Sequence, residues 1–254
     1  MVVSKKRMSS RMVSKQQQLR WLQEGRGQGQ LDTYKPFLNV RDNKSLTERS
    51  SRVYGYKTQR THHLFSDLEL ALFLALDRIQ DIEDIREQIP LDLETTVQIA
   101  EDLKIPHPIE KNVHQILTST FFIVNHSPLK PPCFVVKALK SIHLDQKRTI
   151  AQLELERRYW EQKNIPWFLF TEKDISPTAI DNIKWLYPLN KVNNDIYTFS
   201  KMDFYQNYFL QKPELTLIEL SKYLDTHYSM EAGGSLLEIR ELLAQRYFLF
   251  DITK

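Results

Sequence analysis

ILTSTFFIV at Ile116–Val124 and FVVKAL at Phe134–Leu139 are two runs rich in β-branched and aromatic residues, separated by a loop that contains three prolines. Runs of this composition on either side of a short loop predict a β-hairpin. This stretch decides the fold, because the hairpin together with the helix and strand predicted after it sets the fold class.

A long helix is predicted next, over about Arg148–Lys163, with Asn164 as its stop and Pro166 just beyond it. The apolar run IPWFLFT at Ile165–Thr171 has the length of a further strand. Strand, strand, helix and strand in this order predict an α/β fold.

On the N-terminal side, Ser66 and Glu69 have the spacing of a capping box and predict a helix that starts at Ser66. We interpret Ile82–Leu91 as a short exposed link into a strand, closed by Pro90. A short helix is expected over residues 15–24, stopped by the glycine run at residues 25–29. That run is either a plain turn or a flexible backbone able to follow a nucleic-acid backbone.

The C-terminal quarter reads as a separate helical module. Ser176-Pro177 predicts an N-cap followed by proline at the first helical position, opening a helix to about Tyr187. We place a domain boundary near residues 188–194. Beyond it we expect helices over Asp195–Leu210, Thr216–Asp225 and Ser235–Arg246 and a terminal strand over Tyr247–Ile252, an order typical of a winged helix. Its mixed charge fits protein docking as well as DNA reading.

Composition limits the possible classes. The chain has 254 residues, enough for one large domain or two modest ones. A single cysteine, Cys133, excludes an internal disulfide framework and a thiolate-rich zinc site. No stretch reaches the roughly 18 apolar residues of a membrane span. We therefore expect a cytoplasmic protein that does not enter the membrane.

Charge is distributed unevenly. Residues 1–60 hold 14 Lys and Arg against 4 Asp and Glu, so the net charge of +3 leaves −7 for the remainder. A basic arm before an acidic body predicts a polyanionic partner such as nucleic acid. The alternative is a solvated, disordered tail, which the interleaved aromatic residues Trp21, Tyr34, Phe37, Tyr54 and Tyr56 disfavour.

Several stretches resemble one family. They are EGRGQG at Glu24–Gly29, YKPFL at Tyr34–Leu38, HHLFSDLE at His62–Glu69, DIREQ at Asp84–Gln88, LELERRYW at Leu153–Trp160 and IPWF at Ile165–Phe168. In this order they resemble TnsA, the endonuclease subunit of Tn-seven-like transposases, some of which are CRISPR-associated.

The resemblance implies an α/β restriction-endonuclease-like nuclease domain followed by a small, mainly helical winged-helix-like domain. We expect a basic arm at residues 1–60, the nuclease domain at 61–190 and the C-terminal domain at 191–254. The implied partners are a TnsB-like transposase, a TnsC-like AAA+ regulator and the double-stranded DNA of transposon ends. TnsA cuts the strand that TnsB leaves intact.

The resemblance also implies site residues. Glu69 matches the family's helix glutamate and is the expected metal ligand, and Glu156 matches a further acidic position. Lys140 matches the catalytic lysine best, and Lys137 is the alternative on the opposite face of the strand. Thr120 stands where the family has a strand aspartate.

Register slippage cannot supply the missing acid, because residues 111–144 contain no Asp or Glu. A hydroxyl competes poorly with water for Mg²⁺, so we expect a degenerate site that cleaves weakly or not at all. The alternative is an active endonuclease that holds Mg²⁺ through Glu69, Glu156 and main-chain carbonyls. Thr120→Asp would raise activity if the rest of the site were intact.

The basic arm supplies the expected DNA contacts. They are Arg20, Arg26, Lys35, Arg52, Lys57 and Arg60. A third hypothesis, a DNA-binding or regulatory protein outside transposition, uses the C-terminal helices as the reader.

Overall fold

The computed structural model describes residues 13–42, 49–126, 128–187 and 198–253. The chain divides into two compact units, Met1–Ile175 and Ser176–Lys254. The division lies earlier than the expected boundary between residues 190 and 191, because Leu186 packs into the core of the second unit.

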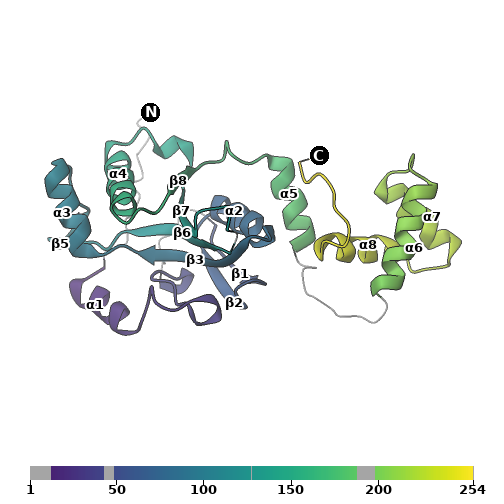
Figure 1. Cartoon of the computed structure of the whole chain (residues 1–254), viewed down its shortest axis with the longest axis horizontal. Coiled ribbons are helices and arrows are strands. Elements are labelled where there is room, and N and C mark those ends of the chain that lie inside the picture. Colours follow the sequence, from purple (N-terminus) through teal and green to yellow (C-terminus); the bar gives the residue numbers. More distant parts are fainter. Residues whose placement is uncertain (1–12, 43–48, 127, 188–197, 254) are drawn as a thin grey trace, which may run out of the picture. The chain divides into compact units, whose positions relative to one another are not determined.

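The first unit is built on a four-stranded sheet in the order β3-β6-β7-β8 (Figure 1). The strands are β3 (Ile82–Pro90), β6 (Thr118–Asn125), β7 (Cys133–Ala138) and β8 (Trp167–Phe170). β6 pairs antiparallel with β3 and with β7, whereas β8 pairs parallel with β7. The mixed α/β architecture and the predicted hairpin are therefore confirmed.

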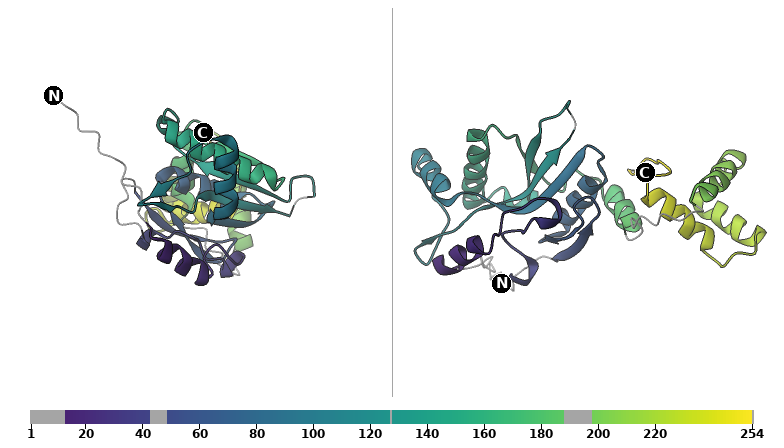
Figure 2. Two further views of the ribbon diagram at one scale, coloured as in Figure 1. Left: turned by 90° about the vertical axis from the view of Figure 1, so that its left-hand side faces the viewer. Right: turned by 60° about the horizontal axis from the view of Figure 1, so that its bottom comes forward.

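Helices cover both faces of this sheet (Figures 1 and 2). Phe121 of β6 lies 6.4 Å, between ring centroids, from Phe73 of α2 (Asp67–Arg78), and Phe122 lies 5.7 Å from Trp160 of α4 (Lys147–Gln162). Because successive strand residues point to opposite faces, α2 and α4 lie on opposite sides. A third helix, α3 (Leu93–Leu103), packs beside α4.

The crossover from β7 through α4 to β8 follows from the sequence. The Val135 side chain is fully buried in one cluster with Leu155 and Trp160, so it anchors β7 beneath α4. Asn164 adopts a left-handed φ of 55°, which ends the helix and turns the chain into β8. The predicted helix, its stop and the following strand are all confirmed.

Residues of the predicted arm fold against the same unit. They form α1 (Lys15–Gln23), two short 3₁₀ turns at Leu31–Thr33 and Val40–Asp42, and the ribbon of β1 (Ser51–Gly55) and β2 (Arg60–Leu64). Trp21, Tyr34 and Phe37 are buried. Aromatic anchoring thus makes the described part of the arm an integral layer of the domain. The alternative prediction of a disordered tail is not tested at residues 1–12, which lie outside the described residues.

Strand β3 and helix α3 differ from the sequence expectation in the first unit. Residues 82–90 form the nine-residue strand β3, which is largely buried, so the interpretation of this segment as an exposed link is wrong. Buried Asp84 and Glu87 gave the segment the charged composition of a surface link. Helix α3, capped by Asp92, was not predicted. A small ribbon of β4 (Ile109–Glu110) and β5 (Val113–His114) follows it.

The second unit is helical. It contains α5 (Pro177–Leu186), α6 (Thr198–Gln211), α7 (Leu217–His227) and α8 (Gly234–Ala244), which share a core around Tyr205, Leu220, Leu224 and Ile239. The predicted terminal strand is wrong, because residues 247–252 are bends, irregular backbone and the start of a turn, and form no strand. The described residues of this unit therefore contain no β wing. The expected boundary at residues 188–194 lies outside the described residues.

No helix in the described ranges is long and apolar enough to cross a membrane.

Candidate functional site

The end of β7 brings Lys137 and Glu156 together. The Lys137 ammonium lies 3.1 Å from Oε2 of Glu156 on α4 and donates a 2.7 Å hydrogen bond to the main-chain carbonyl of Thr118 on β6. Trp167 Nε1 donates to the other carboxylate oxygen of Glu156 at 3.1 Å. Each oxygen of this nearly buried carboxylate is thus held by a donor.

Strand geometry explains why Lys137 reaches α4. Val135, two residues earlier on β7, lies in the core under α4, and Lys137 points to the same face. Of the two lysines considered from the sequence, Lys137 is therefore the one that meets Glu156. Lys140 lies beyond the end of β7, where it precedes the 3₁₀ turn Ser141–His143.

Thr120 occupies a buried position on β6 beside β7. Its hydroxyl accepts a 3.1 Å hydrogen bond from the main-chain N–H of Ala138. The regular ladder between the two strands ends at Phe121 and Val136, so the side-chain oxygen replaces a main-chain acceptor at the next step. The hydroxyl at the expected aspartate position therefore holds the two strands together.

Glu69 lies in the first turn of α2, on the opposite face of the sheet from α4. Its main-chain N–H donates to the Ser66 hydroxyl at 3.1 Å, and its carboxylate accepts from the main-chain N–H of Phe65 at 2.8 Å. The predicted helix start is confirmed, and Glu69 has a capping role in addition to any chemical one.

The described residues at this end of β7 offer few charged ligands for a divalent metal ion. Across the described ranges, no group of three or more His, Cys, Asp or Glu side chains is placed to hold a metal ion. Glu156 is neutralised by Lys137, and Thr120 supplies no charge. Mg²⁺ prefers several carboxylate oxygens in near-octahedral geometry, and of Lys137, Glu156 and Thr120 only Glu156 supplies a carboxylate.

A buried ionic network, not foreseen from the sequence, ties β2 to β3. The Arg60 guanidinium donates to both oxygens of Glu87 at 2.8 and 2.6 Å, and His62 Nδ1 lies 2.7 Å from Oε2 of Glu87. The Thr58 hydroxyl lies 2.7 Å from His62 Nε2. All four residues are buried, which gives the network a structural role.

The network controls the charge of Glu87. Burial alone would raise the pKa of this carboxyl, but the facing His62 and Arg60 outweigh burial and lower the pKa of Glu87 far below its usual 4.5. The sequence does not reveal that Arg60 and Glu87 pair, because they are 27 positions apart.

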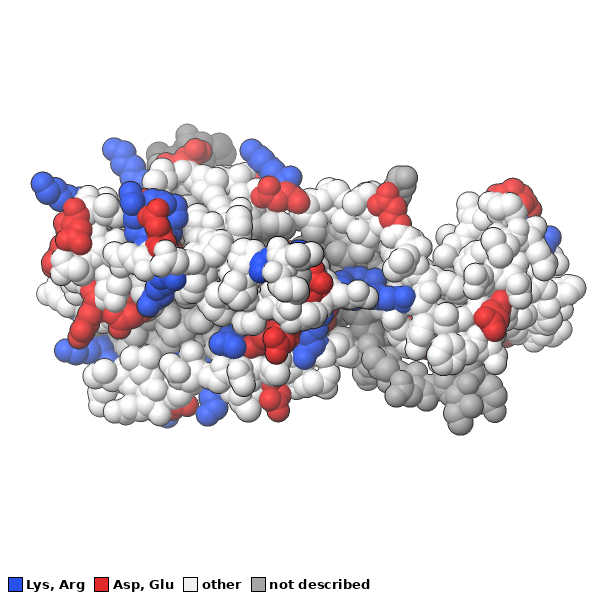
Figure 3. All heavy atoms as spheres, in the orientation of Figure 1, with Lys and Arg blue, Asp and Glu red and all other residues white. Residues whose placement is uncertain are grey.

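The six predicted DNA contacts fall into two groups. Arg60 is buried against Glu87, and Arg26 pairs with Asp42 at 2.5 Å and stacks over Trp21, so their guanidinium groups hold the fold. The other four, Arg20, Lys35, Arg52 and Lys57, lie at or near the surface. On the face shown in Figure 3, basic and acidic side chains are interspersed.

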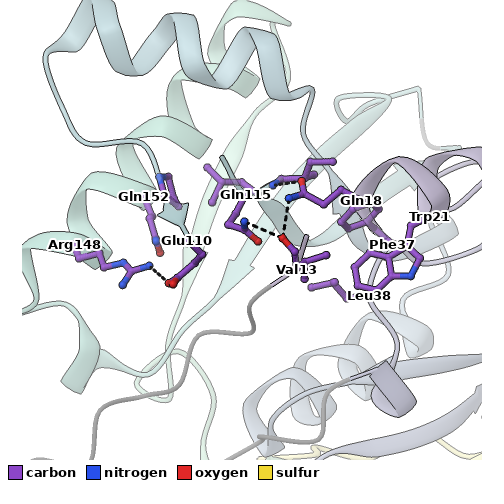
Figure 4. Close-up of a pocket in the computed structure, with 12 residues that line it drawn as sticks. Val13, Gln18, Trp21, Phe37, Leu38, Glu110, Gln115, Arg148 and Gln152 are labelled. Carbon is purple, nitrogen blue, oxygen red and sulfur yellow. Dashed lines mark hydrogen bonds and ion pairs between the residues drawn. The ribbon is translucent and has the colours of Figure 1, made fainter. Parts of the chain in front are cut away.

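A cavity of about 160 Å³ lies between the arm, the segment before β6 and the start of α4, and Figure 4 shows the residues that line it. Gln18 and Gln115 both donate to the carbonyl of Val13, at 3.4 and 3.2 Å. Arg148 Nη2 lies 3.3 Å from Oε1 of Glu110 at the rim. The polar groups at this joint thus bind each other and fix the start of α1.

Comparisons with known proteins cover both units. Residues 80–172 match the family model described as TnsA-like endonuclease N terminal, and residues 174–252 match the model described as TnsA endonuclease C terminal. The chain is also 40% identical over 236 residues to the Transposon Tn7 transposition protein TnsA of Escherichia coli, covering 92% of this chain and 85% of that protein. The two models meet close to the structural division after Ile175.

Proposed function

The chain belongs to the TnsA family of endonucleases, and from this premise we propose that it is the TnsA-like subunit of a heteromeric DNA transposase with a degenerate nuclease site. In this role it engages the double-stranded DNA of transposon ends together with a TnsB-like transposase and a TnsC-like AAA+ regulator. It acts in the cytoplasm.

One observation carries the degenerate site: the Glu156 carboxylate is neutralised by the Lys137 ammonium at 3.1 Å. Phosphodiester hydrolysis by this class of nuclease needs a metal ion to activate water and to stabilise charge on the phosphate. With Thr120 in place of an acid, the site offers that ion too few charged ligands. What remains is a scaffold for DNA and for partner proteins.

The second unit supports the partner-binding part of the proposal. Its helices leave large apolar side chains exposed, with Phe199 71% and Leu210 72% accessible. Its described residues form no β wing, so we assign it protein docking in preference to winged-helix DNA reading.

Family membership itself favours one alternative, an active Mg²⁺-dependent endonuclease that cuts the non-transferred strand. This function requires Glu69 and Glu156 to share a metal with main-chain carbonyls, and therefore requires Lys137 to leave Glu156. It predicts that Glu69→Ala and Lys140→Ala both abolish cutting.

A strand-specific cleavage assay separates the two functions. Labelled transposon ends are incubated with the TnsB-like transposase, with and without this protein, in Mg²⁺ or Mn²⁺. The degenerate site predicts that only the strand cut by the transposase is nicked. Strong nicking of the other strand, lost in Glu69→Ala, establishes the active enzyme instead.

A further inference from the structure

The oxygen atoms around the Lys137 ammonium are of the kind that bind metal ions. One comes from the Glu156 carboxylate and one from the main-chain carbonyl of Thr118. Carboxylate and carbonyl oxygens are the ligands that hard divalent cations take in proteins. The ammonium therefore lies in an oxygen-lined position between α4 and β6.

We infer that the Lys137 ammonium is the resident cation of this site, neutralising Glu156 and occupying the position that a divalent metal would otherwise take. The inference rests on the proposed degenerate site and deepens it, because it names what replaced the metal. Lys137 is here a positioning and charge-compensating residue.

Burial makes a counter-charge at Glu156 obligatory. The Glu156 side chain is 4% exposed and that of Lys137 is 25% exposed. A nearly buried carboxylate without a partner is strongly unfavourable. A tethered ammonium meets this requirement at any metal concentration, and its positive charge repels an approaching divalent ion.

Trp167 makes the cation position observable. Its indole N–H donates to Glu156 at 3.1 Å, so a lanthanide bound to this carboxylate lies beside an aromatic donor. Tb³⁺, a hard cation with oxygen preference, emits when an adjacent tryptophan is excited. The part of the sensitised Tb³⁺ emission that is lost when Glu156 is replaced therefore reports binding at this carboxylate, since the chain has four tryptophans.

The test compares the parent with Lys137→Met and Lys137→Gln. Both variants remove the ammonium, and the glutamine keeps an N–H donor toward Glu156. We expect both to bind Tb³⁺ at least about tenfold more tightly than the parent, a ratio that corresponds to 1.4 kcal/mol of binding free energy. Mn²⁺ is expected to raise the melting temperature of the variants by about 3 to 6 °C at roughly ten times its dissociation constant, and to leave the parent unchanged.

Two controls locate the effect. Lys147→Met removes an exposed lysine from α4, the helix that carries Glu156, and is expected to bind Tb³⁺ like the parent. Adding Glu156→Gln to Lys137→Met removes the carboxylate that needs a cation, so the gain in Tb³⁺ binding is expected to disappear.

The inference is overturned if both folded variants bind Tb³⁺ no more tightly than the parent does. If the variants fold only in the presence of Mn²⁺, the requirement for a cation at Glu156 is upheld. If the variants fail to fold and Mn²⁺ restores folding to neither, that requirement is refuted. Cleavage of the non-transferred strand by the parent overturns the proposed function whatever the lysine variants do. A non-cleaving parent with unresponsive variants removes only the lysine inference.

Discussion

At the scale of single residues, Thr120 and Lys137 have different roles in the site: the Thr120 hydroxyl bonds to the main chain of β7, and the Lys137 ammonium neutralises Glu156. The Thr120 hydroxyl bonds to the Ala138 N–H on β7, and an aspartate there could accept the same hydrogen bond. We therefore expect Thr120→Asp to fold with reduced stability, because it adds a second buried carboxylate, and to gain no cleavage, because Lys137 still neutralises Glu156. The strand-specific assay checks this, with the double variant Thr120→Asp, Lys137→Gln beside it. Full nuclease activity in Thr120→Asp alone would show that the lysine is no obstacle.

Glu87 carries the second prediction at this scale. Glu87→Gln leaves the buried Arg60 without its counter-charge, which costs about 3–5 kcal/mol of unfolding free energy. Glu154→Gln is the matched control, because Glu154 pairs with Arg157 on the surface and contributes about 1 kcal/mol or less. Urea unfolding at pH 7 measures both. Equal losses would contradict the assigned role of burial.

The same carboxylate predicts a pH dependence. The folded-state pKa of Glu87 lies below its ordinary value of 4.5. Its stabilising contribution is therefore complete above pH 4.5 and is lost as the pH falls from 4.5 toward the folded-state pKa. Unfolding free energy of the parent is expected to drop through this acid range more steeply than that of Glu87→Gln. Parallel curves would assign the acid sensitivity to other carboxylates.

At the scale of elements, the glycine turn after α1 is a packed joint. Gly27 donates from its N–H to the carbonyl of Lys35 at 2.6 Å, and a Cβ added there would lie 2.3 Å from Pro90 Cγ at the end of β3. Gly25 has a similar φ, +75° against +82°, but a Cβ there meets nothing within 4 Å. The turn therefore closes on the strand, in agreement with the plain-turn alternative.

This pair gives a matched test. Gly25→Ala is expected to cost about 1–2 kcal/mol for the left-handed backbone alone. Gly27→Ala is expected to cost about 1–3 kcal/mol more, because the methyl group overpacks against Pro90. Thermal unfolding of the two variants measures the difference. Equal melting temperatures would show that α1 and its turn can shift away from β3.

The sequence predicted those helices and strands whose apolar runs and capping residues lie within the element itself. The hairpin, α2 with its Ser66 cap, α4 and β8 each follow from apolar runs and caps within their own residues. Strand β3 was not predicted, because its buried Glu87 finds its partner on a strand far away in sequence. The terminal strand was predicted wrongly, since the aromatic run at residues 247–250 has irregular backbone without a strand partner in the described residues, and Leu249 is 90% exposed.

The candidate site was predicted in part for the same reason. Glu69, Glu156 and Thr120 could be placed by resemblance, but spacing alone could not decide between Lys137 and Lys140. That decision depends on which face of β7 lies under α4, and the Val135 core contact supplies it.

At the scale of the whole molecule, the basic excess of the first 60 residues lies partly inside the fold. Removing all of them would delete Trp21, Phe37 and β1, so a shorter deletion is the informative one. Residues 1–12 contain Lys5, Lys6, Arg7 and Arg11 and no acidic residue.

Deleting residues 1–12 is expected to weaken DNA binding and to flatten the slope of log K against log salt by up to about 4, because each phosphate contact contributes about 0.9. Arg52→Ala, a surface change on β1, is expected to flatten it by about 1. Filter binding or anisotropy at several salt concentrations measures both slopes. An unchanged slope after the deletion would place the DNA contacts elsewhere.

The pairing of Lys137 with a buried Glu156 also restricts how such a protein can evolve. A lineage that lost Lys137 first would carry an uncompensated charge in its interior and depend on ambient metal for folding. One that acquired an acid at position 120 first would place a second buried carboxylate in the site, with Lys137 balancing only one of the two charges. Either first step therefore leaves one unbalanced negative charge in the interior, and under the proposed degenerate site the two substitutions are coupled by the need for a cation.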